Sequence, residues 1–276
     1  MNLWLAQIIA VIRLELRKTF FAKRGLWIYI LAGLPLLLFC FRDIAVMRYH
    51  QNVDIGQDTN IFAGVFQFFF LRLAIFFGCV GIFMNLIRGE MLDRSLHYYF
   101  LAPIRREVLM AGKFIAGLVS AIVIFGTSAL LQFVALYLVF DRPTLEEFFL
   151  RGDGLHHLVA YLGVTVLACI GYGSVFLAAG VLMRNPVIPA AVMLVWESIN
   201  SFLPAFLQKF SVIYYLKSLC PVEVPLQIGP PFSLLAVNPD PASPLVAVPS
   251  LVLLSILVVV WSGVRIRRLE ISYGAD

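Results

Sequence analysis

Long apolar runs separated by short polar segments dominate this chain. Six runs are candidates for bilayer-crossing helices, at about 25–41, 64–87, 114–140, 158–182, 187–207 and 244–264, because a spanning helix needs roughly 20 mainly apolar residues. Helices are predicted because lipid cannot satisfy open backbone groups, and the alternating pattern of a membrane barrel is absent. The sequence therefore predicts an all-α polytopic membrane protein, with residues 1–276 forming a single domain.

Residues 1–24 precede the first predicted span and carry a second pattern. Apolar side chains recur there at helical spacing, at Leu5, Ile8, Ile12, Leu16 and Phe20. Polar side chains take the other positions around the helix, at Gln7, Arg13, Arg17 and Lys18. This pattern predicts an amphipathic elbow helix that lies at the membrane interface and leads into the first span.

Charge gives the predicted orientation. The chain is 61% hydrophobic and 13% charged, with a net charge of +5. If both termini are placed on one side, that side holds fourteen Lys and Arg and the other holds six. Basic residues gather on the cytoplasmic side of membrane proteins. We therefore expect both termini in the cytoplasm, a bacterial cytoplasmic (inner) membrane location, contact with lipid and no nucleic-acid partner.

Two connecting segments have unusual composition. Residues 208–243 are rich in proline yet apolar, and are predicted to pack on the membrane domain from the outer side. Residues 88–101 are polar and charged, and lie between the second and third spans. There, Leu92, Leu96, Tyr99 and Phe100 share one helical side, and Glu90, Asp93, Arg94 and His97 share the other.

The 88–101 helix has two interpretations. It ends before Pro103, which disfavours helix at the preceding residue, and the basic pair Arg105 and Arg106 follows. The helix can lie in the interface while these basic residues bind lipid phosphates. Alternatively, it is a docking element for a soluble cytoplasmic partner, with one face in the membrane and one face free to bind.

The stretch "EMLDRSLHYYFLAPIRREVLMAGK" resembles the signature of ABC-2 type transporter permeases. The matching positions are Glu90, Leu96, Leu101, Pro103, Ile104, Arg106, Gly112 and Lys113. The predicted elbow helix, six spans and long outer segment before the last span agree with that family over the whole chain. One departure is "DRSLHYY", which replaces the Gly-Thr-Leu-Glu form common in the family. This departure leaves the subfamily, and so the cargo, open.

The resemblance implies a permease subunit that forms a homodimer or heterodimer and binds two ABC ATPase subunits. The 88–101 segment would be the coupling helix, with partner contacts at Glu90, Asp93, Arg94, His97, Arg105 and Arg106. ATP and Mg would be held by the partner, because "LMAGKF" lacks the first Gly and the Ser/Thr of a P-loop. The chain is therefore expected to hold no cofactor and to be no enzyme by itself.

Charges within spans are rare and often functional. Glu197 lies roughly 16 Å into the fifth predicted span, and Arg72 roughly 22 Å from the end of the second, at about 1.5 Å per residue. We hypothesise that the two pair or face a polar substrate pathway, which would also include Gln67, Ser198 and Asn200. Alternatively, Arg72 reaches the outer interface, and Glu197 is protonated and hydrogen-bonded within one subunit.

Apolar, aromatic-rich spans suit export of a hydrophobic or amphipathic substrate. The alternative function is a polytopic membrane enzyme or secondary transporter that uses Glu197 as an intramembrane acid or base. No H-E-x-x-H or G-x-S-x-G motif supports an enzyme, and no inverted repeat supports a secondary transporter. The four cysteines are far apart and form no C-x-x-C motif, so no metal site is predicted.

Overall fold

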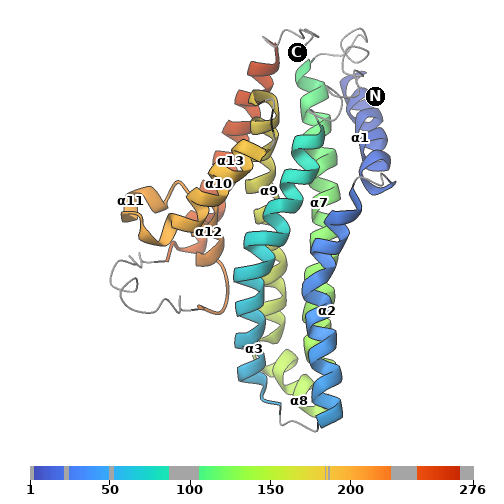
Figure 1. The fold of residues 1–276 in the computed structure, drawn as a ribbon, viewed down its shortest axis with the longest axis vertical. Coiled ribbons are helices and arrows are strands. Elements are labelled where there is room, and N and C mark those ends of the chain that lie inside the picture. Colours follow the sequence, from blue (N-terminus) through green and yellow to red (C-terminus); the bar gives the residue numbers. More distant parts are fainter. Residues whose placement is uncertain are drawn as a thin grey trace.

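The computed structural model describes residues 3–21, 25–49, 53–86, 106–183, 185, 187–224 and 241–267. Every regular element within these ranges is a helix, and none is a strand. The all-α class is therefore confirmed. Figure 1 shows an elongated bundle in which α1 begins and α13 ends at the same end. We call this the termini end, and the end that carries α8 (Arg142–Glu146) the opposite end.

Five helices of the described ranges are long and apolar enough to cross a membrane. They are α2 (Leu26–Tyr49), the continuous helical path Ile55–Met84, α7 (Arg106–Tyr137), α9 (Gly154–Leu182) and α13 (Pro244–Arg267). Each matches one of the six predicted runs, with individual ends shifted by up to nine residues. The polytopic membrane architecture follows from these five helices.

The second of these spans changes its winding along its length. It begins as α3 (Ile55–Gly64), continues as the π-helix η2 (Val65–Ile75), and ends through α4 (Phe76–Cys79) and the π-helix η3 (Val80–Met84). Asp54 caps its start by accepting a hydrogen bond from the Gln57 N–H at 3.1 Å. π-helical turns are rare and frequently occur at functional sites.

The predicted fifth span is not one continuous helix. Residues 187–207 form α10 (Val187–Ile199), the short 3₁₀ helix η5 (Asn200–Phe202) and the start of α11 (Ala205–Gln208), and α12 (Val212–Ser218) follows. At about 1.5 Å per residue α10 is only about 20 Å long, which is less than the hydrocarbon thickness. We call residues 187–218 the broken segment; in Figure 1 its α11 and α12 lie at mid-height, beside the bundle.

Local chemistry explains why α10 stops. The Asn200 side-chain amide donates to the Gln208 carbonyl at 3.3 Å, and the Gln208 amide donates to the Leu203 carbonyl at 2.8 Å. These bonds hold a turn. Pro204 then follows, and a proline has no N–H to continue a helical ladder. Hydropathy alone misses this break because the residues on both sides of it are apolar.

The predicted helix at the start of the chain forms as α1 (Leu3–Phe21) and packs along α7. Its buried side centres on Val11 and Glu15, one residue away from the expected apolar stripe. Gly112 permits the close approach, since a Cβ there would lie 3.0 Å from Cγ1 of Val11. The interfacial position of α1 stays a prediction.

An aromatic core joins the second span to α7 and α9. The ring of Tyr161 lies edge-on to Phe62 and Phe66, with centroids 4.9 and 4.7 Å apart, and Phe133 meets Phe62 at 5.3 Å. Such edge-to-face pairs add about 0.5–1.5 kcal/mol each beyond their buried area. The core therefore holds these three helices as one unit.

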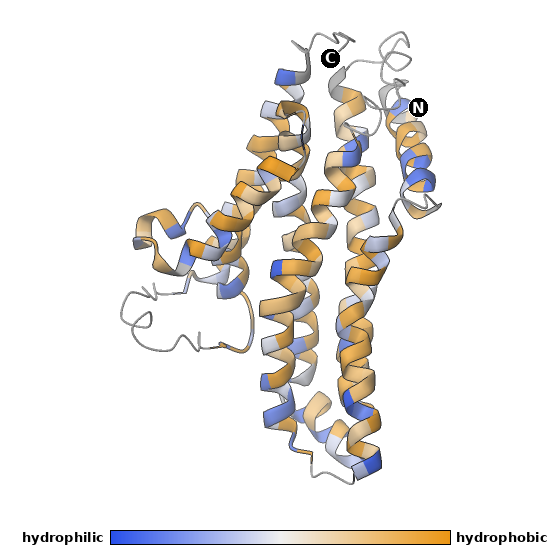
Figure 2. Ribbon diagram, in the orientation of Figure 1, coloured by the Kyte–Doolittle hydropathy of each residue, from blue (hydrophilic) through white to orange (hydrophobic). Residues whose placement is uncertain are grey.

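The surfaces of α2 and α13 that face away from this core are apolar (Figure 2). Leu37 and Phe41 of α2 are 57% and 68% exposed, and Leu253 and Leu257 of α13 are 59% and 61% exposed. Water does not tolerate such continuous apolar faces, whereas lipid does. The surface of the bundle therefore suits a bilayer.

The crossing of α9 over η3 gives a first prediction. A Cβ at Gly173 would lie 2.5 Å from Cζ of the fully buried Phe83. Gly173→Val is expected to cost about 1–3 kcal/mol by overpacking. Thermal unfolding of the detergent-purified chain measures the loss. Gly163→Val, on the same helix where a Cβ meets nothing within 4 Å, is the matched control; equal losses in both variants would contradict the packing argument.

Candidate functional site: the loop base and the broken segment

Most of the predicted partner-binding residues lie outside the described ranges. Glu90, Asp93, Arg94, His97 and Arg105 belong to 87–105, and Arg106 only marks the first residue of α7. Their role in binding an ATPase therefore stays a prediction. The structure describes the residues on either side of this segment, Leu86 and Arg106, and we call the region around them the loop base.

That base contains a buried ion pair that we call the Lys113 node. Nζ of Lys113 donates to Oε1 of Glu15 at 2.6 Å and to the Leu86 carbonyl at 2.9 Å. The Lys113 residue is only 1% exposed, and Glu15 is 3% exposed. The node thus joins α1, the end of the second span and α7.

Elementary electrostatics explains the Lys113 node. The last carbonyls of a helix lack partners within the helix and carry the negative end of its dipole. The Lys113 ammonium satisfies one such carbonyl at Leu86, and Glu15 neutralises the ammonium. The sequence indicated Lys113 only as one of the positions that resemble the ABC-2 permease signature, and Glu15 had no predicted role. A glutamate between two leucines, Leu14 and Leu16, is the signal that could have indicated a buried partner.

Glu197 has a clear structural role in the broken segment. Oε2 accepts the Ser211 hydroxyl at 2.6 Å and the Ile213 N–H at 3.1 Å, and Oε1 accepts the Val212 N–H at 3.1 Å. These donors form the first turn of α12. A carboxylate at this position satisfies backbone N–H groups that have no partner within the helix, and complements the positive end of the helix dipole. Glu197 therefore fixes α12 against α10.

The predicted direct pair between Arg72 and Glu197 is not formed. No nitrogen–oxygen distance of 4.0 Å or less joins these two described residues, because the carboxylate oxygens are turned toward α12. The Arg72 guanidinium carbon instead lies 5.8 Å from the centroid of the Phe68 ring. Lys217 of α12 lies at the same distance, 5.8 Å, from that ring. Arg72 still interacts electrostatically with Glu197 and Tyr172 over longer range.

The other predicted pathway residues divide into two groups. Gln67 is buried and donates to the Val222 carbonyl at 2.7 Å, and Asn200 is buried in the turn described above. Ser198 is exposed, whereas Glu197 beside it is buried. The structure thus brings Gln67, Arg72, Glu197 and Asn200 to the broken segment and its continuation, and leaves Ser198 outside. It adds Lys217, which the sequence reasoning missed although a lone lysine in "VIYYLKSLC" was visible.

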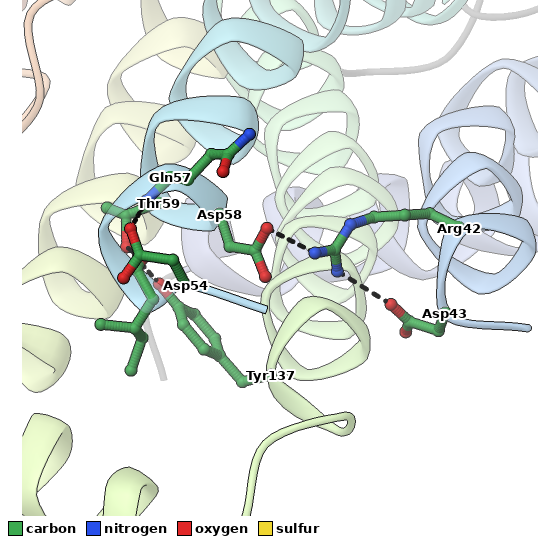
Figure 3. Close-up of polar contacts among 8 residues, drawn as sticks. Arg42, Asp43, Asp54, Gln57, Asp58, Thr59 and Tyr137 are labelled. Atoms are coloured by element: carbon green, nitrogen blue, oxygen red, sulfur yellow. Dashed lines mark hydrogen bonds and ion pairs between the residues drawn. The ribbon is translucent and has the colours of Figure 1, made fainter. Parts of the chain in front are cut away.

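A further polar cluster lies toward the opposite end of the bundle (Figure 3). Arg42 donates to Asp43 at 3.2 Å and also to Asp58, and so ties α2 to α3. The hydroxyls of Thr59 and Tyr137 lie 3.0 Å apart and tie α3 to α7. Arg42 and Asp43 directly follow the predicted first span at 25–41, and their spacing does not indicate which residues they contact.

This cluster gives a second prediction. Arg42→Gln is expected to destabilise the chain by about 1–3 kcal/mol, because it leaves the buried carboxylate of Asp58 without its charged donor. Thermal unfolding in detergent measures the change. Arg48→Gln removes the same charge from an exposed position on the same helix and is expected to stay near the parent. A loss as large in Arg48→Gln would exclude the bridging role.

No group of three or more His, Cys, Asp or Glu residues in the part of the chain that the structure describes is arranged to hold a metal ion. At the loop base and around the broken segment, the described charged groups are the carboxylates of Glu15 and Glu197 and the cations of Lys113, Arg72 and Lys217. No protein-family model, curated protein or solved structure matches this chain.

Proposed function

We propose that this chain is the membrane permease subunit of an ATP-driven exporter of the ABC-2 type. Five apolar helices, a packed elbow helix and a charged segment between the second and third spans support the proposal. In this proposal the termini end is cytoplasmic. Two ATPase subunits bind there, each to the 88–101 segment of one permease, and the permease acts as a dimer with itself or with a similar chain.

The observation that carries the proposal is the Lys113 node. A lever that transmits a push from a soluble motor must be fixed at both of its ends to the elements it moves. Lys113 lies seven positions after Arg106 and bonds to the last described residue before the segment, Leu86. A force applied to 87–105 is thereby passed to the second span, α7 and, through Glu15, to α1.

The alternative of a membrane enzyme or secondary transporter using Glu197 has less support. A general acid or base must reach the proton that it transfers. Both carboxylate oxygens of Glu197 accept hydrogen bonds from the first turn of α12, and the residue is only 4% exposed. A capping role accounts for this geometry fully. We therefore retain the exporter, with a hydrophobic or amphipathic substrate, as the proposed function.

Co-purification tests the proposal. The tagged chain is solubilised from its native membrane and captured, and the captured proteins are examined for an ATPase with a Walker A motif. Glu90→Ala/Arg94→Ala is expected to lose this ATPase, because both charges lie on the polar side of the predicted coupling helix. Arg48→Ala, toward the opposite end, is expected to retain it. Thermal unfolding verifies that each variant is folded; undiminished ATPase capture by the folded double variant would count against the proposal.

A further inference from the structure

Two cations, Arg72 beside the broken segment and Lys217 within it, form no ion pair with any acidic residue that the structure describes. Arg72 of η2 and Lys217 of α12 both lie 5.8 Å from the centroid of the Phe68 ring. Neither side chain is within 4.0 Å of a carboxylate oxygen in the described ranges. Nε of Arg72 is buried without any hydrogen-bond partner. The positive charges of Arg72 and Lys217 repel each other, which is unfavourable.

The nearby carboxylate does not neutralise these cations. Glu197 is the acidic group that interacts with Arg72, but all of its short hydrogen bonds go to the first turn of α12. Contact with the Phe68 ring stabilises a cation far less than removal of a guanidinium or ammonium from water destabilises it. The site therefore has excess positive charge that a bound anion would stabilise.

The surroundings indicate what kind of anion fits. Phe68 is 38% exposed and Leu73 of the same π-helix is 37% exposed, so apolar surface adjoins the two cations. The cations lie along a membrane-crossing helix and on the mid-height broken segment beside it (Figure 1). Guanidinium and ammonium groups together present several donors to phosphate oxygens. An amphiphile with an anionic headgroup satisfies both the charge and the apolar surface.

We propose that Arg72 and Lys217 form a binding site for a phosphate-type anion carried by an amphipathic molecule. Both cations lie near the Phe68 ring, which forms an aromatic wall of the site. This assignment deepens and rests on the proposed function, because it names the chemical class of the exported substrate. The binding step itself requires only the permease chain, so it is testable without an ATPase.

Native mass spectrometry of the detergent-purified chain tests this site. The chain is titrated separately with phosphatidylglycerol, phosphatidylcholine and inorganic phosphate. We expect phosphatidylglycerol to bind well above phosphatidylcholine, and Arg72→Gln or Lys217→Gln to weaken that binding by about tenfold or more, as expected for the loss of a charge-assisted hydrogen bond. Lys209→Gln, an exposed charge in the same segment, is the matched control and is expected to bind like the parent.

Each arm of the experiment has a defined meaning. If only the binding of phosphatidylglycerol depends on Arg72 and Lys217, the ligand is a lipid headgroup. If the binding of inorganic phosphate depends on Arg72 and Lys217 to the same extent, the ligand is a free anion. That result supports the two cations as the site and excludes an amphipathic ligand. Binding unchanged in both variants overturns the site, and Lys217→Gln keeps the test decisive if Arg72→Gln does not fold. If the unaltered chain captures no ATPase in the earlier experiment, these binding results are unaffected, so the two proposals fail separately.

Discussion

Lys113→Met is expected to destabilise the chain by about 3–5 kcal/mol, the largest loss of any single change considered. The substitution leaves Glu15 charged and almost fully buried without its cation, and leaves the Leu86 carbonyl without its donor. Methionine is close to lysine in length, so the loss reports charge and hydrogen bonding more than volume. Denaturant unfolding of the detergent-purified chain measures it.

The partner substitution separates the pair from its surroundings. Glu15→Leu/Lys113→Met removes both charges and is expected to recover much of the loss, because an apolar pair no longer has to be desolvated. Arg17→Met, at an exposed position of α1, is the matched control and is expected to stay within about 0.5 kcal/mol of the parent. A Lys113→Met chain as stable as Arg17→Met would show that the node contributes little.

Glu197→Ala is expected to have the second largest effect, a loss of about 3 kcal/mol or more concentrated in the broken segment. Three donors, on Ser211, Val212 and Ile213, lose their acceptor at once. Each buried donor left unsatisfied costs about 1–3 kcal/mol. Hydrogen exchange followed by mass spectrometry is expected to show loss of protection across α12, and little change in α9.

A neighbouring serine provides the comparison. Ser198→Ala alters an exposed side chain one position along α10, and unchanged exchange in α12 is expected for this variant. Glu197→Gln keeps one acceptor oxygen and is expected to fall between Ser198→Ala and Glu197→Ala. If Glu197→Ala left the hydrogen-exchange protection of α12 intact, the capping assignment would be wrong. A role for Glu197 as an intramembrane acid or base would then be favoured.

The elements that follow from local pattern were predictable from sequence. All five spans in the described ranges are long apolar runs, and hydropathy located each of them, although single ends were off by up to nine residues. The helix of α1 was also predicted. Its buried face was not, because the side facing α7 is set by tertiary contacts such as Val11 against Gly112. Amphipathic spacing alone cannot distinguish a face turned toward lipid from one turned toward a neighbouring helix.

The broken segment shows where pattern reasoning stops. Residues 187–207 have the composition of a span, yet side-chain bonds from Asn200 and Gln208 end the helix after Ile199. The depth estimate for Arg72 and Glu197 placed them near each other, and they do interact over longer range. The depth estimate could not indicate that the carboxylate of Glu197 would accept its hydrogen bonds from the three donors at the start of α12. Partners of a buried charge depend on the path of the chain, which spacing does not contain.

The proposed function requires that residues 88–101, after the second span, face the cytoplasm, where a separate ATPase would bind them. Labelling with a membrane-impermeant maleimide tests this position, with Ser95→Cys as the labelled residue. The background chain carries Cys40→Ser, because Cys40 is exposed whereas the other native cysteines are buried. Glu146→Cys, on the predicted outer side, is the reference and should react in intact cells. We expect Ser95→Cys to react only in inside-out vesicles. Reaction of Ser95→Cys in intact cells would contradict the cytoplasmic position of residues 88–101.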